Sequence, residues 1–496
     1  MEYWSGLGDG FIQLFSWAVM GGLVGGTLVG IIIGVIPGIG ATAGMALLLP
    51  IIFYWPPEVG LVMLSALWMA NNYGSSLSSI LLGIPGDSGA IMTIEDGHPM
   101  AQQGRTGSAI GISLAASAAG GIIGALCFLA FAPPLVSLAL LFGSAEMFWL
   151  ALLALTVVAS ASGHNLGKGL IACGLGMLTG FTGIDTITGY ARFTFGAMYL
   201  MDRVSLVLVL LGIFAVAGLL SAASRQSQVA VQRDARDSIL GGMRLALRYP
   251  LTLLRGSFIG ALFGAVPGLG HTVATVVAYQ QTVSSSSHPD TFGKGDPEGV
   301  AAPEAANNSV QGSALIPTFA LGIPGSASAT IFLAGLTIYG IRLGPRVFVE
   351  DSTLVWTVWW SMTGAVVCFL LLGLLFNRFF VRVTITPFKY LIPVIMVFVV
   401  GGAVSANKSL WDLVVVLLFA VLGYLMKRYD YSLVAFTLGF ILGPIAEANF
   451  FRSLLISGGS AGIFFQGWIN PALIALTVLS LVLHARNELR QRAAST

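Results

Sequence analysis

Long apolar runs follow one another along almost the whole chain, and polar positions are gathered into a few short segments between them. A transmembrane helix needs about 20 apolar residues, and runs at or near this length occur at 204–223, 354–376, 410–426 and 469–484. When interrupted runs are included, we count roughly 11 to 13 membrane-crossing segments. The pattern therefore predicts an all-α polytopic membrane protein.

The composition supports a lipid environment. Hydrophobic residues make up 56% of the 496 residues and charged residues 9%, whereas soluble domains carry about 25% charged residues. Apolar side chains can face outward only where lipid replaces water. The basic residues are dispersed and form no aromatic-interleaved patch, so we expect no nucleic-acid partner. The three cysteines stand singly in apolar runs, which indicates neither a metal site nor a cofactor.

Charge placement predicts the topology. Residues 224–255 contain six arginines opposed by two aspartates, and the positive-inside tendency places such a connector in the cytoplasm. A basic C-terminal tail also predicts a cytoplasmic C-terminus. No Lys or Arg precedes Arg105, which favours an external N-terminus. We therefore divide the chain into a first membrane half (1–223), a basic cytoplasmic connector (224–255) and a second membrane half (256–496).

The two halves contain an internal repeat. Residues 26–42 align without gaps to residues 256–272. The identical pairs are Gly26/Gly256, Gly30/Gly260, Gly34/Gly264, Pro37/Pro267, Gly38/Gly268, Gly40/Gly270 and Thr42/Thr272. A second motif follows in each half, with an Asn pair preceding Leu-Gly-Ile-Pro-Gly at 82–86 and at 321–325. Since one copy starts after a terminus without positive charge and the other after the cytoplasmic connector, we predict inverted repeats.

The repeated glycines and the Pro-Gly-x-Gly segments have different expected roles. The GxxxGxxxG spacing places small residues on one helix face, which favours close helix packing. Proline removes a backbone donor and glycine weakens a helix, so each Pro-Gly-x-Gly should break its helix. Amides at the start of the following half-helix favour an anion, and Thr42 and Thr272 can cap that start. A simple proline kink is the alternative.

The Leu-Gly-Ile-Pro-Gly segments end polar stretches that would be costly in contact with lipid. We interpret each as a re-entrant hairpin or broken helix that lines a cavity. The Asn pairs can ligate a coupling ion such as Na⁺, bind hydroxyl groups of an acid, or act as hydrogen-bond glue between helices. Asp87 follows the first hairpin, aligns to Ser326, and is a candidate ligand of the coupling ion.

These interpretations give two sets of candidate residues. The substrate-binding candidates are Gly38, Gly40, Thr42, Ser75, Ser76, Gly86, Gly268, Gly270, Thr272, Ser313, Gly325 and Ser326. The coupling-ion candidates are Asn71, Asn72, Asp87, Asn307 and Asn308. Two further polar patches, 182–196 with Asp185 and Arg192 and 443–452 with Glu447 and Arg452, favour structural ion pairs over substrate contact.

No nucleophile elbow, zinc-protease, P-loop or paired-cysteine motif occurs, so we expect no enzyme activity and no ATP hydrolysis by this chain. A solute transporter driven by an ion gradient fits the duplicated, broken segments. A passive anion channel is the alternative, since duplicated re-entrant segments also build channels.

Taken together, the two Pro-Gly-x-Gly segments, the two Leu-Gly-Ile-Pro-Gly segments and Asn307-Asn308 resemble the large membrane subunit of the tripartite tricarboxylate transporters, the TctA family. The resemblance extends through 185–196 and 443–452. It implies a secondary importer of citrate-like carboxylates in the bacterial inner membrane, coupled to Na⁺ or H⁺. It also implies a small membrane subunit of about four helices and a periplasmic solute-binding protein as partners. The paired hairpins suggest an elevator-like movement.

Overall fold

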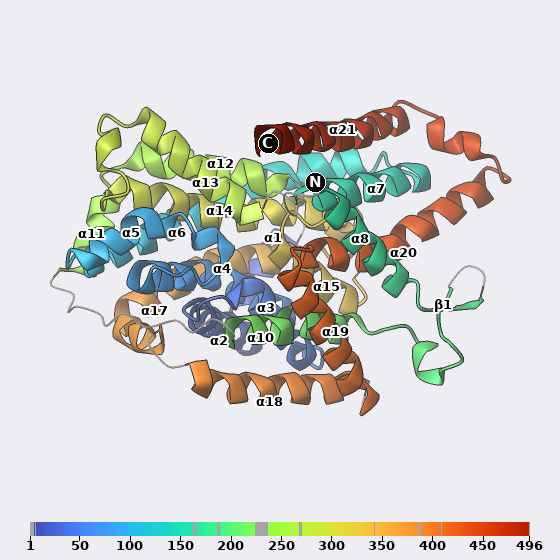
Figure 1. Cartoon of the computed structure of the whole chain (residues 1–496), viewed down its shortest axis with the longest axis horizontal. Helices are drawn as coiled ribbons and strands as arrows, with labels where there is room; N and C mark the ends of the chain where they lie inside the picture. Colours follow the sequence, from blue (N-terminus) through green and yellow to red (C-terminus); the bar gives the residue numbers. More distant parts are fainter. Residues whose placement is uncertain are drawn as a thin grey trace. The chain divides into compact units, whose positions relative to one another are not determined.

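The chain is almost entirely helical (Figure 1). The computed structural model describes residues 4, 6–161, 166–185, 189–223, 237–266, 270–341, 343–384, 388–407 and 409–495. Four of the described helices are long and apolar enough to cross a membrane, namely α2 (Trp17–Gly34), α6 (Thr106–Ala139), α17 (Ser352–Thr384) and α20 (Leu433–Ile456). Several shorter apolar helices accompany them. These features agree with an all-α, multi-pass membrane protein.

The chain divides into two compact units. Unit 1 contains residues 1–136 and 215–405, and unit 2 contains residues 137–214 and 406–496. Each predicted half therefore contributes to both units. The division into halves at the connector stays a prediction, and residues 224–236 of that connector lie outside the described residues.

Within unit 1, each of the two sequence repeats folds into four helices and one 3₁₀ turn, and the turn follows the third helix in the first copy but precedes it in the second. The first copy consists of α2, α3 (Gly40–Ile52), α4 (Pro57–Leu82), the 3₁₀ turn η2 (Ser88–Ala90) and α5 (Thr93–Gln102). The second copy consists of α12 (Pro250–Ala265), α13 (Gly270–Ser285), η5 (Pro289–Thr291), α14 (Pro297–Leu321) and α15 (Ala327–Ile338). In both copies the first helix packs along the long third helix.

The glycine stripes make that packing possible, because they bring two backbones into contact. A methyl group added at Gly26 or Gly30 would lie 2.4 or 2.3 Å from a carbonyl oxygen of α4. The matched positions of the second copy, Gly256 and Gly260, would meet carbonyl oxygens of α14 at 2.5 and 2.2 Å. The packing role expected for the stripes is confirmed in both copies. Whether the copies are inverted relative to the membrane stays a prediction.

Unit 1 contains further helices beside these copies in the sequence. They are α1 (Leu7–Leu14), α6, α10 (Ala217–Ala223), α11 (Ile239–Ala246), α16 (Val347–Glu350), α17 and α18 (Phe388–Asn407). Buried aromatic rings of Phe128, Phe319, Phe348 and Trp356 pack edge to face or stacked in the core. This core includes residues of α6, α14, α16 and α17, so helices distant in sequence are fixed to one another.

Unit 2 is built around α20, which packs against α7 (Ser144–Ala161) and α8 (Leu166–Gly180). Its other elements are β1 (Gly183–Ile184), β2 (Ala191–Arg192), η3 (Met198–Leu200), α9 (Leu206–Leu210), α19 (Trp411–Arg428), η6 (Ala461–Phe465) and α21 (Ile469–Ser495). β1 and β2 pair antiparallel, with Gly183 opposite Arg192. A π-helical stretch, η4 (Leu211–Val216), follows α9.

Candidate functional site

The asparagine pairs lie on α4 and α14 and are completely buried. Asn72 Nδ2 donates to the Asn307 carbonyl oxygen at 3.3 Å, which joins the two copies. Asn71 Nδ2 donates to the Gly30 carbonyl oxygen at 3.4 Å, and Asn308 Nδ2 reaches a carbonyl oxygen of its own helix at 3.5 Å. The amide nitrogens of these three side chains therefore stabilise helix packing or the helix itself.

Several amide atoms of the asparagine pairs have no hydrogen-bond partner. Within the described part of the chain, Asn71 Oδ1, Asn308 Oδ1 and both amide atoms of Asn307 are buried without a hydrogen-bond partner. Leaving such a group unpaired costs about 1–3 kcal/mol, and buried polar groups in native proteins are normally paired with protein, water or ligand. The oxygens form a set of acceptors able to bind a hydroxyl group or a protonated carboxyl group.

The predicted serine candidates are buried in the same two helices. Ser75 Oγ donates to the Asn72 carbonyl oxygen at 2.9 Å, and Ser313 Oγ donates to carbonyl oxygens of α14. Ser76 Oγ lies 3.1 Å from the same Asn72 carbonyl oxygen and also contacts Glu304. Ser75 and Ser313 thus contribute to the stability of their helices.

Both Pro-Gly-x-Gly segments separate two helices. α2 ends at Gly34 and α3 begins at Gly40, whereas α12 ends at Ala265 and α13 begins at Gly270. Gly40 and Gly270 have φ values of 64° and 62°, in the left-handed region that glycine tolerates best. Gly38 is exposed at the first break, and Gly268 lies outside the described residues.

At the first break, a carboxylate of the protein occupies the helix start where an external anion would bind. The Ala41 N–H, in the first turn of α3, donates to Asp87 Oδ2 at 2.9 Å. The carboxylate complements the positive end of the α3 dipole. The half-buried Asp87 is therefore a partner of this helix start, and a substrate carboxylate at the same amides would have to displace it.

The second break differs because Ser326 stands in place of Asp87. Ser326 Oγ accepts a hydrogen bond from the Ala329 N–H at 3.2 Å and so caps α15. Among the described residues, no side chain accepts a hydrogen bond from the first turn of α13, which contains His271 and the half-buried Thr272. The start of α13 is consequently the better candidate for binding an external anion.

The two copies contact each other near the starts of α3 and α15. Thr42 Oγ1 of α3 lies 3.3 Å from Ser328 Oγ of α15. Gly89 in η2 packs so closely on the second copy that an added methyl group would lie 2.2 Å from Asn307 Oδ1 and 3.0 Å from His271 Cβ. The start of α13, the asparagine oxygens and the turn around Asp87 therefore belong to one neighbourhood in unit 1.

The last glycine of each Leu-Gly-Ile-Pro-Gly segment packs against the first helix of its own copy, α2 or α12. A methyl group at Gly86 would lie 2.0 Å from the Gly34 carbonyl oxygen, and one at Gly325 would lie 2.4 Å from the Gly264 carbonyl oxygen. Their role in substrate binding stays a prediction, but their small size is required for packing.

Sequence reasoning did not select Glu304, although it is the most extensively hydrogen-bonded carboxylate beside this neighbourhood. It lies on α14, three residues before Asn307, and is completely buried. Hydroxyl groups from α4, α5 and α6 surround it. A lone carboxylate in a stretch of small and apolar residues was the signal available in the sequence.

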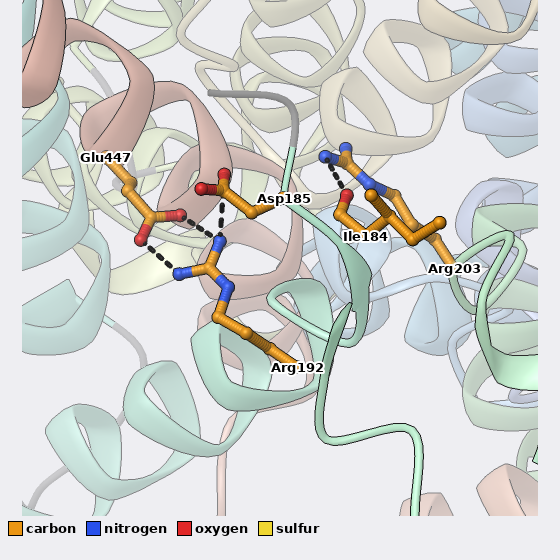
Figure 2. A network of polar contacts seen from close by, with 5 residues as sticks. All are labelled: Ile184, Asp185, Arg192, Arg203 and Glu447. Carbon is orange, nitrogen blue, oxygen red and sulfur yellow. Dashed lines mark hydrogen bonds and ion pairs between the residues drawn. The ribbon is translucent and has the colours of Figure 1, made fainter. Parts of the chain in front are cut away.

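Unit 2 contains a separate polar network (Figure 2). Arg192 forms a bidentate pair with Glu447, at 2.6 and 2.9 Å, and a second ion pair with Asp185 at 3.1 Å. The hydrogen-bonded pair with Glu447 raises the pKa of Arg192. Ion pairing within these patches was expected, and the structure shows that it joins the two patches. Arg203 and Arg452 line a depression of about 290 Å³ beside this network.

Comparisons with known proteins agree with this fold. Residues 20–438 match the model of the tripartite tricarboxylate transporter TctA family. The chain is 34% identical over 462 residues to an uncharacterized 52.8 kDa protein in the TAR-I ttuC′ 3′ region of Agrobacterium vitis, covering 92% of this chain and 90% of that protein. It is 31% identical over 233 residues to an uncharacterized protein in the TAR-II ttuC′ 3′ region of the same organism, covering 47% of this chain and 96% of that protein. No solved structure matches. The chain belongs to the tripartite tricarboxylate transporter TctA family.

Proposed function

We propose that this chain is a secondary active importer of tricarboxylates and related carboxylates, such as citrate, across the bacterial inner membrane. In this proposal an ion gradient drives transport, a periplasmic binding protein supplies the substrate, and a small membrane subunit completes the complex. Family membership supports the class of protein. The observation that supports the site is the meeting of both broken repeats around unpaired buried amide oxygens.

The proposed site has two parts with different chemistry. The first turn of α13 offers backbone N–H groups and the Thr272 hydroxyl to a carboxylate, since a helix start favours an anion. The amide oxygens of Asn307 and Asn308 accept hydrogen bonds from a hydroxyl or protonated carboxyl group. A hydroxy acid with several carboxyl groups carries both kinds of partner.

Uptake by proteoliposomes tests this proposal. The purified chain with its small subunit and binding protein should accumulate ¹⁴C-citrate, or another di- or tricarboxylate of a panel, in a saturable manner when a Na⁺ or pH gradient is imposed. Ohmic, gradient-independent flux would instead indicate a passive anion channel. Absence of flux for every organic acid would refute the proposal.

A matched pair of variants tests the site. Thr272→Val removes the hydroxyl at the start of α13, and we expect KM to rise by about five- to tenfold, which corresponds to one hydrogen bond of about 1 kcal/mol or slightly more. Thr282→Val is the control, because Thr282 Oγ1 donates to the Ala278 carbonyl oxygen within the same helix. An equal change of KM in both variants would contradict the assignment of α13.

A further inference from the structure

Glu304 is surrounded by hydroxyl groups from three other helices. Ser76 Oγ of α4 lies 2.6 and 2.7 Å from its two carboxyl oxygens. Ser113 and Ser117 of α6 contact Glu304 Oε2 at 3.2 and 3.0 Å, and Thr93 at the start of α5 contacts Oε1. All five side chains are buried. The carboxyl group therefore has a built environment made of hydroxyl groups.

No cation pairs with this carboxyl group within the described ranges. The titratable side chains on the elements that pack against α14 are Glu58, Tyr73, Glu95, Asp96, His98, Cys127, Arg244, Arg255, His271, Tyr279, Glu350, Cys368, Arg378 and Arg382, with Asp87 beside η2. Burial and the four hydroxyl groups therefore determine the electrostatics of Glu304.

Burial of a carboxyl group without a cation favours its protonated form, whereas hydroxyl groups that donate to it favour the carboxylate. The contacts of Ser76 are consistent with a neutral carboxyl group. Its hydroxyl has one proton and lies 3.1 Å from the Asn72 carbonyl oxygen. When Ser76 donates to Asn72, the short contact with Glu304 is a hydrogen bond only if Glu304 donates.

The same contacts connect Glu304 to the proposed substrate site. Ser76 bridges the carboxyl group and the Asn72 carbonyl oxygen, and Asn72 Nδ2 donates to the Asn307 carbonyl oxygen. Loss of the proton would require Ser76 to turn its hydroxyl from Asn72 to the carboxylate. Protonation of Glu304 and the hydrogen bonding of α4 against α14 are thus linked through one hydroxyl group.

Comparison of the two copies shows that the packing of the repeat does not require Glu304. Gly30 packs on Leu67 and Gly260 packs on Ala306, so in this packing register the counterpart of Glu304 in the first copy is Ser65. Both copies pack their first helix on the third in the same register without sharing this residue. The carboxyl group is therefore not needed to build the repeat, which favours a role specific to the second copy.

We propose that Glu304 carries the proton that couples transport to a pH gradient, an inference that rests on the proposed import function. In the conformation described here Glu304 is protonated, and it releases its proton in another state of the transport cycle. The contacts suit a proton, because each hydroxyl oxygen lies within hydrogen-bond distance of a carboxyl oxygen.

Transport by the complete complex in proteoliposomes tests the coupling. Glu304→Gln keeps the shape and hydrogen bonding of the side chain but cannot exchange a proton. With ¹⁴C-citrate, or the acid that the wild type transports best, we expect counterflow exchange to persist while accumulation under a pH gradient falls. The loss should be about tenfold per pH unit, since one proton across one unit is worth a factor of ten. Thr318→Val, which removes a buried hydroxyl that donates only to the Ala314 carbonyl oxygen within α14, should retain both activities.

Two outcomes would overturn the proposal. One is unchanged pH-driven accumulation by Glu304→Gln, and the other is wild-type accumulation that follows a Na⁺ gradient and ignores the pH gradient.

Infrared spectroscopy of the purified wild-type complex separates this inference from the import function. A protonated-carboxyl band that titrates with pH and disappears in Glu304→Gln would support the proposal even if no tested acid is transported. If Glu304→Gln does not fold, Glu304→Asp should shift this band. Absence of any such band in the wild type would refute a protonated Glu304.

Discussion

A single methyl group added at Gly30 would test whether backbone contact between α2 and α4 stabilises the first copy. The added carbon would lie 2.3 Å from the Leu67 carbonyl oxygen. Real Cβ atoms essentially never approach other atoms this closely, and a backbone oxygen cannot rotate away. The two helices would have to separate along the stripe, and they would lose part of the dispersion energy at each neighbouring contact.

The expected cost can be bounded. Overpacking in a well-packed interior typically destabilises by about 1–3 kcal/mol. Replacing glycine by alanine in a helix contributes up to about 1 kcal/mol in the opposite direction. Gly25→Ala is the matched control, because this neighbouring position on α2 has open space around an added methyl group. Both variants share this gain, which cancels in the comparison, so we expect Gly30→Ala to be less stable than Gly25→Ala by about 1–3 kcal/mol, the cost of overpacking alone.

Equilibrium unfolding in mixed micelles, followed by tryptophan fluorescence, measures this difference. Gly260→Ala should behave like Gly30→Ala, since its added methyl group would meet a carbonyl oxygen of α14 at 2.2 Å. Equal unfolding free energies for Gly30→Ala and Gly25→Ala would show that the helices adjust freely, and the reasoning from backbone contact would be wrong.

Three other changes give separate tests. Gly83→Ala places a side chain in a left-handed C-cap with φ of 65°, so the unfolding free energy should fall by about 1–2 kcal/mol. Arg192→Lys loses the bidentate pair with Glu447, and hydrogen–deuterium exchange around β2 should accelerate while exchange in α4 stays unchanged. Asp87→Asn keeps an acceptor at the start of α3 but removes a negative charge near the start of α13. We expect the KM for a carboxylate to fall by about two- to fivefold, a change of roughly 0.5–1 kcal/mol, and a raised KM would contradict the proposed position of the anion.

The sequence predicted those features that depend on residues close to one another along the chain. Helix breaks at the Pro-Gly-x-Gly segments follow from the missing proline donor and the flexibility of glycine. Backbone packing along the stripes follows from the four-residue spacing of glycines such as Gly26 and Gly30. The burial of the asparagine pairs was also implied, because an amide next to lipid is costly.

The sequence could not predict features that depend on distant partners. Asp87 lies 46 residues from Ala41, whose N–H donates to its carboxylate. The sequence therefore could not show that a carboxylate of the protein occupies the start of α3 and that none does so at the start of α13 among the described residues. The four hydroxyl groups around Glu304 come from α4, α5 and α6, and only the folded chain brings them together. Arg192 and Glu447 are separated by 255 residues, and the sequence suggested ion pairs without giving their partners.

The contact between Ser76 and Glu304 has a consequence for the biogenesis of the protein. The two residues are separated by 228 residues of chain. At translation rates of about 5–20 residues per second, roughly 10 to 45 s pass between their synthesis. During this interval the polar face of α4 has no α14 to pair with, and unpaired polar groups are costly in lipid. We expect α4 to wait at the insertion machinery or in water until α14 emerges, so the first copy matures only after the second has been made.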